Sequence, residues 1–401
     1  MISSYARVEL QPGLARHLRE GHPWVFKRGL AAVPRLPAGA VVDVCEGGRF
    51  AARGYFDPHS AIAVRVLTRD PSRPIDSKFF DEEVARCLAA RRELLDLSNT
   101  DSFRWIHGES DGLPGIIVDV YAGFAVVKLY SAGLKAYRAM LIDALTRAWP
   151  ELKGIVGRDE VGRDDGEGDE LSGEGQMLWG QKAPQPLKIL ENGLSFWVDV
   201  YAGQKTGFFL DQRDNRALIR TFSKGRDVLN CFCFSGGFSV NAAMGGATRV
   251  FSVDQDADAI ALARDNFEAN GLRAAQHDFL AGDAFELLAS FKEEGRTFDM
   301  VILDPPAFAK SQKAVEGALA GYASLNRQAM ALLRPGAMLA TASCSARVSV
   351  DEFMGAIKEA AVKSRLDLRL VAERYQQADH PVRLGFPEGR YLKFYVFRVA
   401  G

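Results

Sequence analysis

Two residues of this chain combine a reactive side chain with a position suited to catalysis. Cys344 follows the largely apolar run 338–342, and Asp304 follows the run 300–303. Both runs are typical of buried strands, and the two prolines directly after Asp304 end the second one. Because ligands bind beside the carboxyl ends of parallel strands, we expect both side chains to face one crevice. Cysteine is well suited to covalent catalysis at neutral pH.

An isolated cysteine is often only a small buried hydrophobe, so the neighbouring Asp304 is what favours a catalytic role for Cys344. We expect the other four cysteines to be structural; they are Cys45, Cys87, Cys231 and Cys233. An odd number of scattered cysteines forms neither a disulfide framework nor a paired zinc pattern. We therefore predict free thiols and no metal site.

A glycine turn lies upstream of both residues. The run from 227 to 233 resembles a buried strand and passes through Gly236 and Gly237 into a helix-compatible run. Such a turn brings bare backbone beside a ligand. It matches neither the dinucleotide fingerprint nor a P-loop. We predict cofactor contacts from this turn, at Phe234, Ser235, Gly236 and Gly237.

Three acids follow the turn in a defined order. Asp254 ends a short apolar run on the order of 20 residues later, where doubly wound folds present an acid to ribose hydroxyls. Asp283 lies in a loop, and Asp304 ends the third strand. This order is that of Rossmann-like S-adenosylmethionine-dependent methyltransferases, so we predict that cofactor, with contacts from all three acids. Helix capping is the alternative for Asp254 and Asp283.

A methyltransferase has a chemical use for Cys344. C5 of cytosine is too electron-poor to attack a sulfonium methyl group, whereas addition of a thiolate to C6 makes C5 nucleophilic. Asp304 could bind the amino edge of the base and support protonation at N3. The polar stretch 204–213 could fold over the cofactor, which makes Phe209 and Gln212 candidate contacts; an amphipathic hairpin is the alternative.

At 401 residues the chain exceeds the usual size of a single core. Residues 1–72 consist of short alternating runs with Gly and Pro between them, which predicts a small β-barrel. Residues 75–188 predict a central α+β domain, and residues 190–401 an α/β catalytic domain. We expect Trp24 and Phe26 of the barrel to be core residues, with a stacking platform for RNA as the alternative.

Charge is uneven along the chain although its net value is −1. Residues 1–74 contain eleven Lys and Arg against six Asp and Glu, and residues 159–174 contain eight acids and one Arg. The basic N-terminal module could meet phosphates, and the acidic run is expected to be a solvated loop. The sequence has neither a bilayer-length apolar run nor an apolar signal segment, so we expect a cytoplasmic protein.

These motifs together resemble the bacterial 23S ribosomal RNA cytosine-5 methyltransferases of the large-subunit methyltransferase I type. The resemblance covers nearly the whole chain and is carried by the following segments: 22–26, 109–115, 207–213, 234–240, 304–308 and 343–345. It implies a PUA domain that binds RNA, a class I methyltransferase domain of Rossmann-like α/β fold and, commonly, a homodimer. It further implies 23S ribosomal RNA as the substrate and Cys344 as the thiol that attacks C6. Many other RNA cytosine-5 methyltransferases carry a second cysteine after the proline of the Asp motif, and segment 304–308 has none.

Three alternative functions remain at this point. Methyltransferases that act on exocyclic amines of guanine or adenine also use an Asp-Pro-Pro motif, but Phe308 lies one residue later than in their pattern. An RNA-binding assembly factor without activity is disfavoured by the joint presence of Asp254, Asp283, Asp304 and Cys344. Methylation of a small molecule is disfavoured by the basic N-terminal module.

Overall fold

The computed structural model describes residues 5–158, 175–309 and 311–400. The predicted acidic loop, 159–174, lies outside the described residues. None of the helices in the described ranges is both long enough and apolar enough to cross a membrane.

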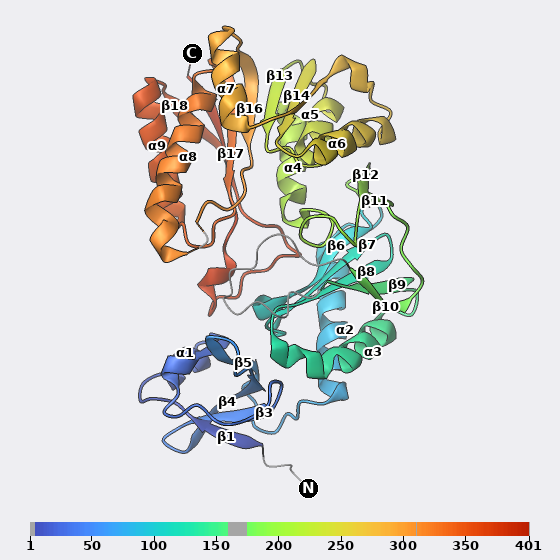
Figure 1. Cartoon of the computed structure of the whole chain (residues 1–401), viewed down its shortest axis with the longest axis vertical. Coiled ribbons are helices and arrows are strands. Elements are labelled where there is room, and N and C mark those ends of the chain that lie inside the picture. Colours follow the sequence, from blue (N-terminus) through green and yellow to red (C-terminus); the bar gives the residue numbers. More distant parts are fainter. Residues whose placement is uncertain (1–4, 159–174, 310, 401) are drawn as a thin grey trace. The chain divides into compact units, whose positions relative to one another are not determined.

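The chain forms two compact units (Figure 1). The first comprises the described residues of Met1–Glu191, Val198–Leu210 and Ala378–Gly389, and the second comprises those of Asn192–Trp197, Asp211–Gln377 and Arg390–Gly401. A segment close to the C-terminus therefore belongs to the first unit. The boundaries predicted from the sequence, after residues 72 and 188, stay predictions.

The N-terminal part of the first unit is a small barrel. Its sheet has the order β1-β3-β4-β5-β2, and only β1 and β3 pair in parallel. A bridge between Leu10 and Leu30 joins the two edges, since these residues follow β1 and β2 closely. The predicted barrel is confirmed. Its elements are β1 (Ala6–Glu9), α1 (Ala15–Arg19), β2 (Trp24–Phe26), η1 (Lys27–Gly29), β3 (Val41–Glu46), β4 (Arg49–Phe56) and β5 (Ile62–Thr68).

A second five-stranded sheet of the first unit has the order β10-β9-β8-β7-β6. Asp76 caps α2 by accepting a hydrogen bond from the amide of Phe79 at 3.0 Å, and Phe80, Val84 and Leu88 of that helix are buried in the core. The predicted α+β architecture is confirmed. Its elements are α2 (Ser77–Leu94), β6 (Ser102–His107), η2 (Gly108–Asp111), β7 (Ile116–Tyr121), β8 (Phe124–Leu129), η3 (Ala132–Tyr137), α3 (Arg138–Ala148), β9 (Gly154–Gly157) and β10 (Gln176–Gly180). The chain then continues through β11 (Leu187–Glu191) and β12 (Leu194–Val198).

The second unit is built on a seven-stranded sheet of order β15-β14-β13-β16-β17-β19-β18. Five strands are parallel, and β19 enters antiparallel between β17 and β18. Numbered along this unit, the parallel strands run 3-2-1-4-5, as in a doubly wound fold. The strands are β13 (Asp227–Cys231), β14 (Arg249–Asp254), β15 (Asp278–Ala281), β16 (Phe298–Leu303), β17 (Leu333–Ser343), β18 (Leu368–Arg374) and β19 (Lys393–Val399).

Helices cover both faces of this sheet. Helices α7, α8 and α9 pack on one face around a large apolar cluster, and α4, α5 and α6 lie together on the other (Figure 1). Their bounds are α4 (Arg213–Phe222), α5 (Gly237–Met244), α6 (Ala257–Ala269), α7 (Ala284–Glu293), α8 (Val315–Met330) and α9 (Val350–Ser364), with short turns η4 (Leu210–Gln212), η5 (Ala274–Gln276), η6 (Gln312–Ala314) and η7 (Pro387–Gly389). The predicted Rossmann-like domain is therefore confirmed, and its edge opposite the strand starts is where a ligand is expected.

Candidate active site

The carboxyl ends of three neighbouring strands lead to the glycine turn, to Asp304 and to Cys344. Strand β13 pairs with β16, with Cys231 opposite Leu303, and Leu303 is opposite Thr341 of β17. Asp304 therefore lies between the glycine turn that follows β13 and the end of β17, which Cys344 follows. The strand order reverses between β13 and β16, and open α/β sheets bind ligands at such a reversal.

The turn after β13 is held in a strained conformation. Phe232, Phe234 and Gly236 have φ values of 61°, 47° and 77°. Non-glycine residues in this region cost of order 1 kcal/mol or more and persist only where the surroundings hold them. The amide of Phe234 donates to Oδ2 of Asp254 at 2.8 Å. A Cβ atom on Gly236 would lie 2.8 Å from that of Ala263, so only glycine lets the turn pack on α6.

Ser235 has a buried polar atom that suits a ligand. Its side chain is 1% exposed, and its Oγ has no hydrogen-bond partner in the described part of the chain. Leaving a buried hydroxyl unsatisfied costs about 1–3 kcal/mol. Helix α5 begins two residues later at Gly237, and its first amides favour a carboxylate. The turn therefore fits the amino-acid end of S-adenosylmethionine.

The two acids farther along the edge differ in their local bonds. Asp254 ends β14 half-buried and accepts from the amides of Phe234 and Asp256. Asp256, not Asp254, caps α6, so the capping alternative is wrong for Asp254. Asp283 is exposed and caps α7 through Oδ1, so the capping alternative is confirmed there. Both carboxylates keep lone pairs that could accept from hydroxyl or amino groups.

Asp304 is bound by a residue that the sequence predicted as a cofactor contact. Nε2 of Gln212 donates to Oδ1 of Asp304 at 2.8 Å, and Nδ2 of Asn215 donates to Oε1 of Gln212 at 2.6 Å. Both amides are buried, so this chain fixes the orientation of the carboxylate. The hairpin alternative for 204–213 is wrong, since η4 and then α4 begin there. Phe209 belongs to the first unit, where Lys205 Nζ lies 4.2 Å from its ring centroid.

Cys344 differs from the other cysteines in its exposure. It is half-buried, whereas the other four are buried: Cys45, Cys87, Cys231 and Cys233. Burial raises the pKa of all four thiols, in Cys87 and Cys231 to about 12. Thiols with such a pKa stay protonated at neutral pH and are poor nucleophiles. Sγ of Cys344 lies 3.9 Å from the carbonyl oxygen of Pro305, which places it beside the Asp304 loop.

Comparison with known proteins decides the family. A family model described as S-adenosylmethionine-dependent methyltransferase matches residues 118–377, and a PUA-like domain model matches residues 8–69. The chain is 41% identical over 396 residues to Ribosomal RNA large subunit methyltransferase I of Shewanella denitrificans. The aligned region covers 98% of this chain and 99% of that protein. The chain belongs to this methyltransferase family.

Further relatives agree. The protein of the same name from Klebsiella pneumoniae is 39% identical over 399 residues, covering 99% of both chains. A methyltransferase structure from Streptococcus mutans superposes with a TM-score of 0.85 at 24% identity, covering 98% of this chain and 100% of that one. SMU.776, solved in complex with SAH, gives 0.86 at 23% identity with the same coverage. The methyltransferase fold and the predicted cofactor, S-adenosylmethionine, are confirmed.

One buried residue at the start of β19 is not among the site residues predicted from the sequence. Lys393 begins β19 opposite Ser343, and its Nζ donates to the carbonyl oxygens of Ser345 and Val348 at 2.7 Å each. Its side chain is 1% exposed. The sequence carried a signal for it, because Lys393 is a lone charge in the apolar and aromatic run 391–397.

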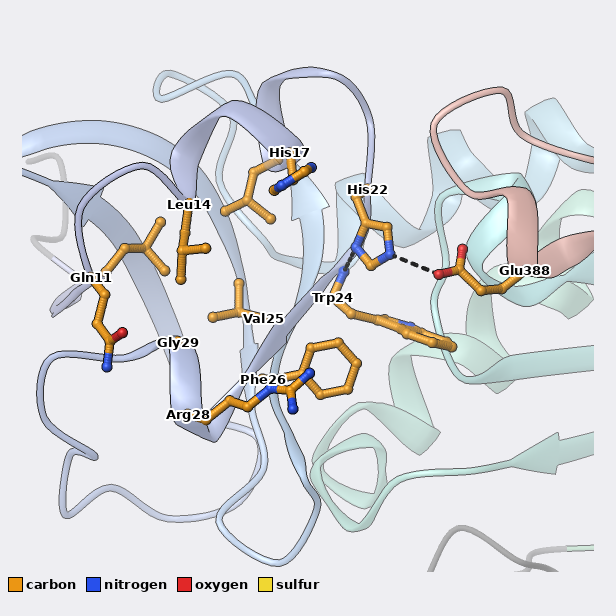
Figure 2. A pocket seen from close by; sticks show the side chains of 12 residues that line it. Gln11, Leu14, His17, His22, Trp24, Val25, Phe26, Arg28, Gly29 and Glu388 are labelled. Carbon is orange, nitrogen blue, oxygen red and sulfur yellow. Dashed lines mark hydrogen bonds and ion pairs between the residues drawn. The ribbon is translucent and has the colours of Figure 1, made fainter. Parts of the chain in front are cut away.

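The PUA-like barrel has a pocket of its own, within the first unit (Figure 2). It measures about 530 Å³ and has an apolar floor that includes Leu14 and Val25. Trp24, Phe26 and Arg28 line it, and all three side chains can be followed in Figure 2. Trp24 and Phe26 are half-buried, so their predicted place in the core is wrong. Their partly exposed rings line the pocket, which is what stacking on an RNA base requires.

A late segment of the chain completes one wall of this pocket. Nε2 of His22 lies 3.5 Å from Oε1 of Glu388, and the ring of Phe386 lies 4.7 Å from that of Trp24. Nε1 of Trp24 donates to Glu109 at 2.9 Å. These contacts hold the indole in place while Arg28 stays over the ring of Phe26, 5.5 Å from its centroid.

Proposed function

We propose that this protein methylates C5 of a cytosine in the 23S ribosomal RNA of the large subunit, with S-adenosylmethionine as the methyl donor and Cys344 as the covalent nucleophile. The observation that carries the proposal is the exposure of Cys344. It is half-buried beside the Asp304 loop, while burial raises the pKa of the four other thiols. The name of the relatives at about 40% identity supports a large-subunit ribosomal RNA substrate.

In the proposed mechanism the Cys344 thiolate forms a bond to C6, and the C5–C6 π electrons become available at C5. Asp304, oriented by Gln212, binds the amino edge of the base and favours protonation at N3. The bound S-adenosylmethionine supplies the methyl group. Loss of the C5 proton to a base then restores the double bond and expels the thiolate. Segment 304–308 holds no second thiol for this step.

The turn from Phe234 to Gly237 and the carboxylates of Asp254 and Asp283 are proposed to hold the cofactor, with the buried Ser235 Oγ as one polar contact. The target cytosine has to leave its base stack to meet a half-buried thiol.

We further propose a cytoplasmic homodimer, to be tested by light scattering of the purified protein.

The decisive experiment compares the wild-type protein with Cys344→Ala on ribosomal RNA from a strain that lacks this gene, with nucleoside mass spectrometry as the readout. We expect 5-methylcytidine from the wild type only, while calorimetry gives equal S-adenosylmethionine affinity for both. RNA with 5-fluorocytidine at the target should trap a covalent complex with the wild type, because fluorine cannot leave as a proton does. Full turnover by Cys344→Ala, or a methyl group on an exocyclic amine, would overturn the proposal.

We propose that the barrel pocket contacts the RNA, with Trp24 and Phe26 as stacking surfaces and Arg28 facing a phosphate. Arg28→Ala should weaken RNA binding. It should also reduce the slope of log affinity against log salt concentration by about one, because one phosphate contact is lost. Arg35→Ala is the matched control, since Arg35 is exposed and is not among the residues that line the pocket. Equal effects of the two substitutions would contradict this role.

A further inference from the structure

Lys393 is a buried cation at the end of the strand that flanks the site. Its side chain is 1% exposed, and β19 pairs with β17 so that Lys393 is opposite Ser343, the residue before Cys344. Taking an ammonium group out of water costs several kcal/mol unless polar partners compensate. A methionine would fill this position without that cost, so the presence of a lysine indicates a role for its charge or its hydrogen bonds.

The partners of Lys393 lie in the loop that follows Cys344. Its Nζ donates to the carbonyl oxygens of Ser345 and Val348, both at 2.7 Å. Oγ of Ser345 also lies 2.9 Å from Oη of Tyr322, so the residue after the thiol is bound from two sides. These bonds hold the backbone of the loop in one conformation next to the thiol.

Carbonyl oxygens bind an ammonium group but do not cancel its charge. Burial lowers the pKa of Lys393 to about 8, and the negative charges of Cys344 and Glu352 act in the opposite direction. Glu352 is exposed and accepts from Ser349 in the capping box of α9, so water screens its charge. Below about pH 8 the ammonium is therefore charged, and Cys344 is the partly buried titratable group whose negative charge acts on it. Tyr322, whose hydroxyl contacts Oγ of Ser345, stays neutral in this range because burial raises its pKa.

We propose that Lys393 is a positioning residue for Cys344, whose ammonium fixes the loop 345–348 and favours the thiolate over the thiol. The inference rests on the proposed function only in taking Cys344 as the nucleophile. When the thiol ionises, its proton leaves to water and Lys393 remains an ammonium, so no bond to Lys393 forms or breaks.

The test uses the full-length protein and the rate of Cys344 alkylation by iodoacetamide, followed from pH 6 to 9.5 by mass spectrometry of the peptide that contains Cys344. Lys393→Gln removes the charge and keeps an amide that can donate to the carbonyls. We expect its alkylation midpoint to move to higher pH, with a rate at pH 7 reduced roughly tenfold for each pH unit of the shift. Lys393→Arg keeps a charge and should keep the wild-type midpoint.

Methyl transfer gives a second readout of the same variants. The turnover of Lys393→Gln should fall at pH 7 with an unchanged KM for S-adenosylmethionine, and raising the pH should restore it. A purely structural role would not give rescue by pH. An unchanged alkylation midpoint in Lys393→Gln would overturn the inference, whether or not Cys344→Ala is active, so the two proposals can fail separately.

Lys393→Gln could fail to fold, which loss of S-adenosylmethionine binding would reveal. In that case the electrostatic coupling between Lys393 and Cys344 can be measured from the titration of Lys393 instead. An NMR titration of labelled lysine in Cys344→Ala should give a lower midpoint for Lys393 than in the wild type, because coupling between two ionisable groups is reciprocal. Equal midpoints would overturn the inference as well.

Discussion

Two ion pairs of the first unit and one lysine of the second hold their buried charges differently. In the first unit Arg91 pairs with Asp111 and Arg104 pairs with Asp119, and none of the four side chains is more than 12% exposed. In the second unit the buried ammonium of Lys393 binds backbone carbonyl oxygens. An ion pair neutralises both of its members, so its field is weak outside the pair. A cation held by neutral groups keeps its field and can act on a neighbouring thiol.

The paired charges of the first unit join segments that are distant in the sequence. The amide of Arg104 donates to Asp379 at 3.0 Å, and Oγ1 of Thr206 donates to Asp119 at 2.5 Å. We infer that a buried charge is structural where a residue of opposite charge neutralises it. Where only neutral dipoles bind the charge, it remains available for chemistry. Three substitutions test this contrast.

The largest effect is expected from Asp111→Ala. The substitution leaves the buried guanidinium of Arg91 without its carboxylate, and breaking a buried pair in this way costs about 3–5 kcal/mol. The free energy of unfolding, measured in urea, should fall by that amount. Asp81→Ala is the control: its pair with Arg147 is 37% and 53% exposed and should matter by about 0–1 kcal/mol. Similar losses in both variants would remove the contrast.

A smaller effect, on activity, is expected from Gln212→Leu. The hydrogen bond from Gln212 to the Asp304 carboxylate is of a kind worth about 1.5–3 kcal/mol, so kcat should fall roughly 10- to 100-fold. Asn215→Ala, one bond farther from Asp304, should reduce kcat less. If Gln212→Leu instead raises the KM for S-adenosylmethionine at constant kcat, the role in cofactor binding predicted from the sequence holds.

The smallest effect concerns acid stability. Burial lowers the pKa of His107 well below 6.5, and the charges of His380, Arg104 and Arg91 lower it further while Asp379 opposes them. Below pH 6.5 the unfolded chain binds a proton that the folded chain does not, so stability falls as the pH falls. The free energy of unfolding should therefore be lower at pH 5.5 than at neutral pH. His107→Gln should flatten this slope in melts at pH 7.5 and 5.5; an unchanged slope would exclude His107 as the cause.

Much of the second unit could be predicted from local patterns. Each of the runs before Asp254, Asp304 and Cys344 is apolar and ends abruptly, and β14, β16 and β17 lie there. Capping was harder to assign, because Asp254 and Asp256 are both acids near the start of α6 and only the backbone angles decide which one caps it. The residue roles at the site stay predictions.

By itself, the sequence determined where strands end and which side chains stand at those ends, because apolar runs and the residues that interrupt them are local properties. Parallel pairing then brings Asp304 and Cys344 to one edge of the sheet. Only the tertiary structure decided that β19 inserts between β17 and β18 and carries Lys393 to the loop after the thiol. It also decided that Gln212 binds Asp304, 92 residues away. Such contacts depend on pairing between distant segments, which no local pattern encodes.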